Sequence, residues 1–189
     1  MHFIIKNETN QNFIASEYCN IVNSYTLDCF YEMGFKECIL SSELDDESMK
    51  LLISDFKDRH GFLLNVGVLA YGKLDMMLMK SCPIGTFYKN KNIHCERCHK
   101  EVYELNDRIG VRYRLIGDSS CNTRILMDKP IYLLDKISDL NALSVNSIYI
   151  HFVDETKEKV NDILTHYLDN EASYNASKHT RGHYNRRPL

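Results

Sequence analysis

The chain has no apolar run long enough to cross a membrane and no signal-peptide pattern at its start. A membrane helix needs about 18 or more apolar residues in succession, whereas the N-terminal segment MHFIIKNETNQNF holds only a short apolar stretch. These absences exclude the membrane and secreted classes, and we expect a cytoplasmic protein. Thiols stay reduced in that compartment, so we do not expect the cysteines to form disulfides.

The chain also lacks a strong net charge, an internal repeat and the motifs of well-known hydrolases. Its formal net charge is −3 at pH 7, which gives no overall attraction to nucleic acid, although the C-terminal segment HTRGHYNRRPL is locally basic. Neither His-Glu-x-x-His nor Gly-x-Ser-x-Gly occurs. The sequence thus identifies no peptidase mechanism, and it leaves a local RNA contact open.

Strand and helix patterns alternate in the first part of the chain and again in the last. With 44% hydrophobic and 26% charged residues, the composition is that of a soluble globular protein. Strands are expected over 13–20, 36–41, 62–72 and 145–153. Helices are expected over 25–33, capped by Ser24, over about 46–60, and over 135–143 and 157–168. Strands and helices at this spacing predict parallel strands with right-handed crossovers.

The pattern divides the chain into three segments. Residues 1–80 are expected to form β/α units of a partial barrel, residues 81–127 a cysteine-rich β lobe with a hairpin, and residues 128–189 a resumed β/α unit with a basic tail. The expected fold class is therefore α/β, with a partial (β/α) barrel-like parallel sheet and a small cysteine-bearing β lobe. A closed (β/α)8 barrel needs about twice the strands counted here, and an open sheet fits the pattern as well.

Four of the seven cysteines lie in polar, loop-like sequence: Cys82, Cys95, Cys98 and Cys121. Four thiolates close a tetrahedral zinc site or hold an iron-sulfur cluster, and both sites need a tight Cys-x-x-Cys pair plus thiols from other loops. Cys82-Pro83 is similar to the Cys-Pro found at cluster ligands of small ferredoxins, which favours an iron-sulfur cluster. Zinc stays open as the alternative.

The other cysteines and the histidines near the pair are interpreted differently. Cys19, Cys29 and Cys38 fall within expected strands or helices, and we expect them to be buried thiols without a metal. His94 and His99 flank the Cys-x-x-Cys pair and are substitute ligands, although surface histidines are common.

Several short motifs occur in a fixed order between about residues 14 and 187. They are NIVNS at 20–24, SSEL at 41–44, YGKLDMMLMKSCPIG at 71–85, LNDR at 105–108, an aspartate before a cysteine at 118 and 121, and TRGHYNR at 180–186. In this order they resemble the motifs of peptidase family U32, the collagenase-like proteins. The chain is similar to the C-terminal portion of a family member, because members begin with additional β/α units of a barrel.

The resemblance implies two activities. The family is named for collagenase-like peptidase activity, yet several members are iron-sulfur proteins that support oxygen-independent or prephenate-dependent hydroxylation of tRNA, rRNA or quinone precursors. Loop cysteines beside a β/α segment would set a redox cluster near the strand ends where barrels build active sites, which favours RNA hydroxylation. The alternatives are a peptidase and a non-catalytic, metal-stapled remnant that binds a partner.

Polar residues on or near the matched motifs are the candidates for the site. Glu43, Arg108 and His183 are the expected catalytic residues, although Glu43 equally suits a helix cap. Arginine and lysine side chains suit an RNA phosphate or a carboxylate-bearing cosubstrate such as prephenate, whereas many exposed ones only solvate the surface. The expected substrate-binding residues are Asn23, Tyr71, Lys73 and Arg124.

An incomplete barrel also predicts a protein partner. The exposed edge of a partial sheet must be covered, so we expect a homodimer or a partner chain that completes the barrel. No membrane partner is expected.

Overall fold

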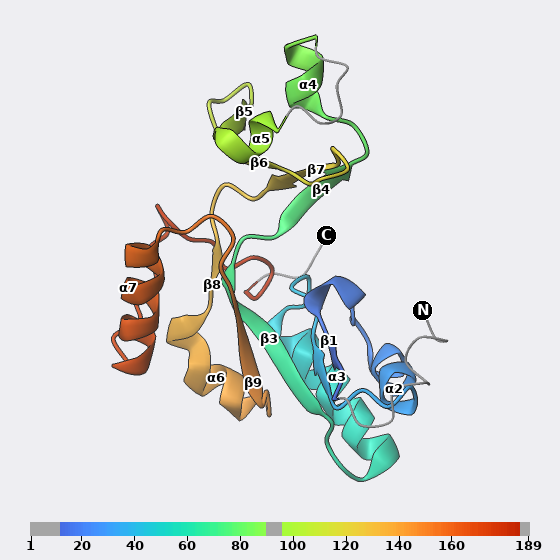
Figure 1. Cartoon of the computed structure of the whole chain (residues 1–189). Coiled ribbons are helices and arrows are strands. Elements are labelled where there is room, and N and C mark those ends of the chain that lie inside the picture. Colours follow the sequence, from blue (N-terminus) through green and yellow to red (C-terminus); the bar gives the residue numbers. More distant parts are fainter. Residues whose placement is uncertain (1–11, 90–95, 186–189) are drawn as a thin grey trace. The chain divides into compact units, whose positions relative to one another are not determined.

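A computed structural model describes residues 12–89 and 96–185, and the chain divides into two compact units. Unit 1 comprises Met1–Gly72 and Ile131–Leu189. Unit 2 comprises Lys73–Pro130 and is inserted in the sequence of unit 1, as the colours of Figure 1 show. The three-segment division expected from the sequence stays a prediction. Among the described residues, no helix combines the length and apolar character that a membrane crossing requires.

Unit 1 is built on a five-stranded, mainly parallel sheet. The strands β1 (Ile14–Ala15), β2 (Glu37–Ile39) and β3 (Asn65–Gly72) pair in that order, all parallel. On β3, β9 (Ser147–His151) is parallel and β8 (Ile131–Tyr132) is antiparallel. All of β3 after its first residue is buried, which explains its almost continuous apolar sequence. The α/β class is confirmed, and both sheets of the described residues are open.

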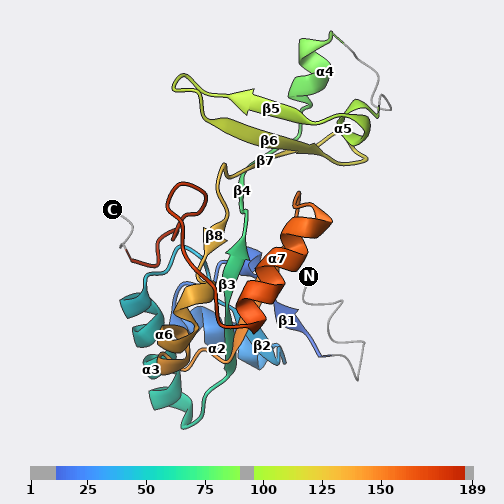
Figure 2. The same ribbon diagram turned by 90° about the vertical axis from the view of Figure 1, so that its left-hand side faces the viewer.

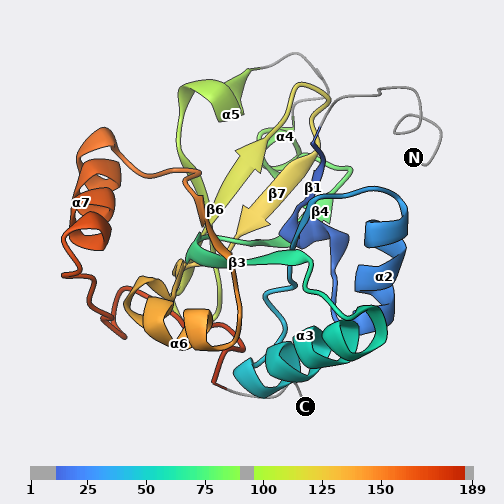
Figure 3. The ribbon, with the colours of Figure 1, turned by 90° about the horizontal axis from the view of Figure 1, so that it is seen from below.

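Helices form an arc along the sheet of unit 1 (Figure 3). They are α2 (Ser24–Glu32), α3 (Asp46–His60), α6 (Ile137–Ala142) and α7 (Lys157–Leu168), with the short 3-10 helices η1 (Glu17–Cys19) and η2 (Leu134–Lys136). Helix α3 buries Met49, Leu52, Ile53 and Phe56, the stripe that a period of 3.6 residues predicts. Burial of this stripe positions the loop that precedes α3.

The ends of the helices follow from local side-chain chemistry. Asp45 caps α3 by accepting a hydrogen bond from Ser48 N at 2.7 Å, and Gly61 ends the helix in the left-handed region at φ 73°. The expected cap of α2 was wrong by one residue. Asn23, and not Ser24, accepts from Thr26 N at 2.9 Å, because Asn23 has the extended backbone of a cap just before the helix and Ser24 is already helical.

One expected strand is much shorter than predicted. The strand expected over 13–20 ends at Ala15, and η1 follows because Ser16 O accepts from Cys19 N at 2.9 Å. Asn20 then adopts the left-handed region at φ 51°, which stops the 3-10 turn. The chain therefore bends at Glu17 instead of continuing along the sheet.

Unit 2 contains a four-stranded antiparallel sheet in the order β4-β7-β6-β5. The strands are β4 (Asp75–Met79), β5 (Tyr103–Asn106), β6 (Arg112–Gly117) and β7 (Thr123–Leu126), and the short helices are α4 (Pro83–Phe87) and α5 (Arg97–Lys100). Strands β5 and β6 form the expected hairpin, with α5 beside β6 (Figure 2). The buried hydrophobic cluster of unit 2 is small and consists of Ile84, Leu115 and Ile125.

Candidate functional site

Three of the four cysteines predicted as metal ligands approach one end of the sheet of unit 2. Thr123, the first residue of β7, pairs with Met79 at the end of β4 and with Gly117 at the end of β6. Cys82 follows Met79 in the chain, and Cys121 precedes Thr123 in the turn that joins β6 to β7. The antiparallel register thus directs two segments that are distant in sequence to the same edge.

Cys98 reaches the same end from α5. A Cβ built on Gly117 would lie only 2.5 Å from Cys98 Sγ, so the thiol occupies the space that any larger residue at 117 would fill. Cys82 and Cys98 both pack against the cluster of Ile84, Leu115 and Ile125. Glycine at position 117 is therefore what admits the Cys98 thiol to the sheet.

Cys82 and Cys121 are held by their own local structure. Cys82 caps α4, and its Sγ accepts a hydrogen bond from Gly85 N at 3.2 Å. Pro83 is the first residue of the helix, where a backbone N–H would have no partner within the helix. Cys121 lies at φ 60°, and its N–H donates to Asp118 O at 3.0 Å. The Cys-Pro sequence is thus a helix start, which the sequence analysis did not foresee.

The buried hydroxyl of Thr123 lies at the same end of the unit 2 sheet. Thr123 is fully buried, and its Oγ1 has no hydrogen-bond partner among the described residues. Alternation along β7 puts its side chain on the same face as Ile125, the face against which Cys82 and Cys98 pack. A thiolate or a cluster sulfur would accept the hydrogen bond that this hydroxyl lacks, so the surroundings fit sulfur ligation of a metal.

The complete predicted ligand set extends beyond the described residues. Cys95 and His94 lie outside them. Within 12–89 and 96–185, no group of three or more His, Cys, Asp or Glu side chains is arranged to hold a metal ion. His99 is exposed on α5. The four-cysteine site stays a prediction.

The cysteines of unit 1 have three different environments. Cys38 is fully buried, and this burial, aided by the neighbouring Cys19 thiol, raises its pKa to about 12. Cys19 is half-buried. Cys29 is exposed on α2, so its expected burial was wrong, because α2 turns only the side containing Ser24 and Leu27 inward.

Two of the predicted catalytic residues lie in neighbouring loops of unit 1. Glu43 is exposed in the loop between β2 and α3, and His183 is exposed in the C-terminal segment. These loops are linked, because Tyr184 O accepts a hydrogen bond from Asp46 N at 3.2 Å. Since Asp45 caps α3, Glu43 is not needed as a cap.

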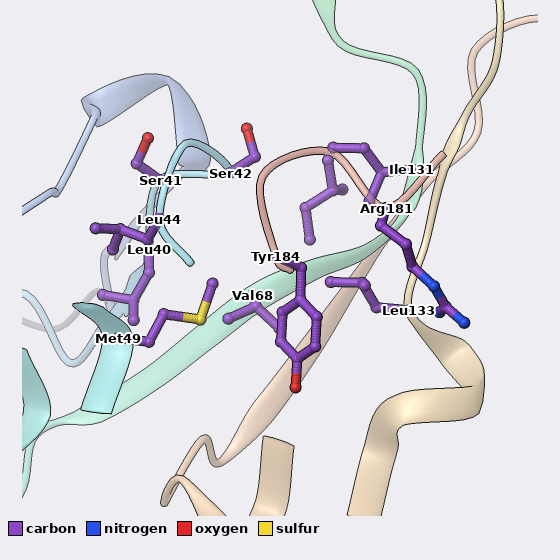
Figure 4. Close-up of a pocket in the computed structure, with 11 residues that line it drawn as sticks. Leu40, Ser41, Ser42, Leu44, Met49, Val68, Ile131, Leu133, Arg181 and Tyr184 are labelled. Carbon is purple, nitrogen blue, oxygen red and sulfur yellow. The ribbon is translucent and has the colours of Figure 1, made fainter. Parts of the chain in front are cut away.

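A narrow pocket lies between these loops and β3. Its lining includes Ser42, Met49, Val68, Leu133 and Tyr184, and Figure 4 shows the ring of Tyr184 lying between Val68 and Leu133. The lining is mainly apolar. The predicted polar residues therefore flank this pocket and do not line it.

Arg181 is a residue that the sequence analysis missed. Its guanidinium makes a two-pronged contact with Asp135, with Nη2 2.7 Å from Oδ2, and Nη1 donates to Tyr132 O at 2.9 Å. It also stacks over the Tyr174 ring, with Cζ 3.9 Å from the centroid. The TRGHYNR motif thus supplies the clamp that holds the C-terminal segment on unit 1.

Two predicted substrate-binding residues of unit 1 have structural partners. Tyr71 is buried, and its hydroxyl donates to Glu155 Oε1 at 3.0 Å. Burial and the Glu155 carboxylate raise the Tyr71 pKa, so the hydroxyl stays protonated. Asn23 is exposed and serves as the α2 cap.

The remaining predicted residues belong to unit 2. Arg124 lies on β7, with Nη1 3.5 Å from Asp75 Oδ2. Lys73 is half-buried at the start of the unit, and Arg108 is exposed in the turn of the β5–β6 hairpin. Within unit 2, Arg108 and Arg124 are thus on different elements.

Unit 1 also has a polar cleft of about 170 Å³ beside α7. Lys159 and His166 line it from α7, and Lys178 and His179 line it from the C-terminal segment. Burial and the charges of Lys159 and Lys178 lower the pKa of His179, so this buried ring is neutral at pH 7. The excess of cationic donors suits an anionic ligand.

The fold defines an α/β protein with a parallel sheet and a separate antiparallel sheet. The family model described as Peptidase family U32 matches residues 1–187, essentially the whole chain. The chain therefore belongs to peptidase family U32, as the motif order predicts. A search of curated proteins found no match, and a search of solved structures found none either.

Proposed function

We propose that this chain is an iron-sulfur protein of the RNA hydroxylation type within peptidase family U32. The observation that supports it best is the position of Cys82, Cys98 and Cys121 at one end of the unit 2 sheet. With Cys95, three residues before Cys98 in the sequence, these thiolates would hold the cluster. The bound cluster would supply one-electron redox chemistry.

Zinc is the alternative occupant of the same thiolates. A zinc ion would cross-link α4, α5 and the β6–β7 turn without any redox role. The small core of unit 2 supports either metal, because so few buried side chains leave the sheet in need of a cross-link.

Arginines on the opposite face of the unit 2 sheet support an RNA partner. Arg112, Arg114 and Arg124 alternate with the buried residues Leu115 and Ile125, so they project from the other face. Arg112 is exposed, and its Nη1 makes only a long contact of 3.8 Å with Glu104 Oε2. Such donors suit phosphate oxygens.

The polar cleft of unit 1 suits the second proposed ligand, a carboxylate-bearing cosubstrate such as prephenate. Lys159 and Lys178 would pair with its carboxylates, and Asn175 adds an amide to the lining. Titration calorimetry with prephenate tests this, and Lys159→Ala should weaken binding by about tenfold. No measurable heat with the wild-type chain would remove the cleft from the proposal.

We also propose that the parallel sheet of unit 1 is part of a (β/α) barrel. Side chains from strands on either side of β3 meet across it, as Glu37 on β2 and Ser147 on β9 do by hydrogen bonding. Gly67 between them has no side chain and leaves room for this contact, and parallel strands joined through helices are the units of such barrels. We propose that a second copy or a partner chain covers its edge, and light scattering would measure the assembly.

Anaerobic purification of the whole chain tests the metal centre directly. A broad visible absorption band with iron and sulfide in the protein would support the cluster, and Cys98→Ser should abolish both. Cys29→Ser, on exposed α2, is the matched control and should retain them. A colourless protein with bound zinc would overturn the redox function, and a protein without metal would overturn the site.

RNA binding and modification are measured separately. Replacing Arg112 and Arg124 by alanine should weaken tRNA or rRNA binding and lower the dependence of log K on log salt by about one per phosphate contact. Lys50→Ala on α3 is the control. Mass spectrometry of RNA from cells with and without the chain should then detect a nucleoside that has gained one oxygen atom, and identical RNA would contradict hydroxylation.

A further inference from the structure

Glycines on β3 let side chains from both neighbouring strands meet. At Gly67, an added Cβ would lie 2.5 Å from Ser147 Oγ, and this oxygen donates to Glu37 Oε1. A bulge between Leu69 and Tyr71 then brings Gly72 level with His151. At Gly72, an added Cβ would lie 2.9 Å from His151 Cβ. 

A carboxylate lies near His151 at the second of these glycines, Gly72. Glu17 lies in η1, directly after β1, where the chain bends out of the sheet. Its Oε1 is 3.8 Å from His151 Nδ1, although β1 and β9 lie on opposite sides of β3 in the sheet order. The pair therefore sits at the carboxyl ends of parallel strands, the edge where α/β sheets bind ligands.

The two side chains are buried without the hydrogen bonds that burial requires. The Glu17 side chain is only 2% exposed. Both Glu17 carboxylate oxygens and His151 Nδ1 are buried and have no hydrogen-bond partner among the described residues. Unpaired buried polar atoms are uncommon because each costs its desolvation, so their concentration on one pair points to a functional role.

The His151 ring is only partly covered. Its side chain is 25% exposed although Nδ1 is buried, and Nε2, unlike Nδ1, is not among the buried atoms that lack a partner in the described residues. The ring centroid of Tyr149 lies 5.9 Å away on the same strand. Nδ1 thus faces a buried carboxylate, while part of the side chain is accessible from solvent.

We propose that Glu17 and His151 form a proton-transfer dyad at the carboxyl end of the parallel sheet. Glu17 keeps a proton on Nδ1 of His151, which leaves the lone pair on Nε2. A hydroxyl or carboxylic acid of a ligand at this edge gives its proton to Nε2, and Glu17 stabilises the resulting imidazolium. Hydrogen bonds of this kind are often long without ligand and tighten when it binds, as 3.8 Å allows.

His151 contacts the ligand in this arrangement, and Glu17 is the positioning residue. The dyad lies in unit 1, whereas the cysteines proposed as metal ligands lie in unit 2. It does not rest on the proposed metal centre, and a protein without metal would leave it intact.

The tautomer of His151 tests the dyad without knowledge of the substrate. A long-range proton–nitrogen NMR spectrum of the whole chain, assigned with His151→Gln, should show a protonated Nδ1 and an unprotonated Nε2. Glu17→Met removes both oxygens at similar volume and should return the ring to the usual Nε2-protonated form. Glu37→Gln alters a carboxylate on the same sheet and should leave His151 unchanged.

Reactivity gives a second readout on the same proteins. Diethyl pyrocarbonate modifies unprotonated imidazole nitrogens, and mass spectrometry locates the product. His151 should react several-fold more slowly in Glu17→Met, while exposed His183 reacts equally in both proteins. An Nε2-protonated His151 in the wild-type spectrum would overturn the dyad even if the variant failed to fold, and so would unchanged reactivity in a folded variant.

Discussion

Units 1 and 2 are stabilised in different ways. Unit 1 covers a parallel sheet with helices and buries large side chains such as Phe56, Leu27 and Leu140. Unit 2 has an antiparallel sheet with three buried residues in its cluster, and Met76, Met77 and Leu78 of β4 are all exposed. Hydrophobic burial accounts for unit 1, whereas unit 2 has too little of it to be stable in the same way.

The cysteines have different environments in the two units. In unit 1, Cys38 behaves as one more buried apolar side chain. In unit 2, Cys82 and Cys98 pack around a cluster that is small without them. If unit 2 binds the proposed metal, ligation by thiols would take the place of burial where the core is small, and four changes test this comparison.

The largest effect is expected from removal of the metal. A chelator, or Cys98→Ser, should unfold unit 2 and leave unit 1 folded, because metal ligation in small domains supplies on the order of 10 kcal/mol of folding free energy. Hydrogen exchange should show loss of protection in β5, β6 and β7 with β3 unchanged. Equal protection before and after chelation would show that unit 2 is stable by burial alone.

Phe56→Ala should produce the next largest effect, confined to unit 1. Phe56 is fully buried and stacks on His60 with ring centroids 4.4 Å apart, so its truncation should cost about 3–5 kcal/mol of unfolding free energy. Urea denaturation measures the loss. Leu51→Ala, at a position that is 60% exposed on the same helix, should cost far less. A similar loss for both would argue against the core assigned to unit 1.

Gly117→Ala should separate packing from ligation in unit 2. The added methyl would clash with Cys98 Sγ, which should cost about 1–3 kcal/mol and lower the metal content. Ser119→Ala in the neighbouring turn is the control. Full metal content in the folded glycine variant would mean that the Cys98 thiol has room to move.

The smallest expected effect concerns acid stability of unit 1. Burial raises the pKa of Asp135, but the bonds from Arg181 outweigh it and leave the pKa below its ordinary value. A lowered folded pKa stabilises unit 1 above the unfolded pKa of about 4, and this contribution is lost as the pH falls through the lower folded value. Asp135→Asn should lose about 1 kcal/mol at pH 7 and flatten the acid limb of the stability curve. An unchanged pH profile would contradict a stabilising clamp.

The sequence predicted unit 1 better than unit 2. The stripe on α3 and the apolar run of β3 are strong periodic signals, and Asp45 and Gly61 mark helix ends with known chemistry. Strands β4 and β7 were both missed, and for β4 the reason is that the exposed DMMLM segment does not alternate between apolar and polar residues. A strand at the edge of a small sheet needs no such alternation.

The candidate sites were predictable only in part. The motif order gave the family, and the loop position of the cysteines singled out four thiols, of which three lie in the described residues at one end of the unit 2 sheet. Glu17 gave no signal because it belongs to no matched motif, and Arg181 lies in the TRGHYNR motif but its partner Asp135 lies far along the chain. His151 was not predicted as a site residue either, because it lies within a segment expected to be an ordinary strand.

The sequence by itself determined the local features of this protein: the alternation of strands and helices, most helix ends and the supply of thiols. These depend on neighbours within a few residues, so short patterns encode them. The tertiary structure decided which distant residues meet, including Cys98 against Gly117 and Glu17 beside His151. Such meetings depend on strand register and on where a glycine leaves room between strands, and register is set by packing over the whole unit and not by any single segment.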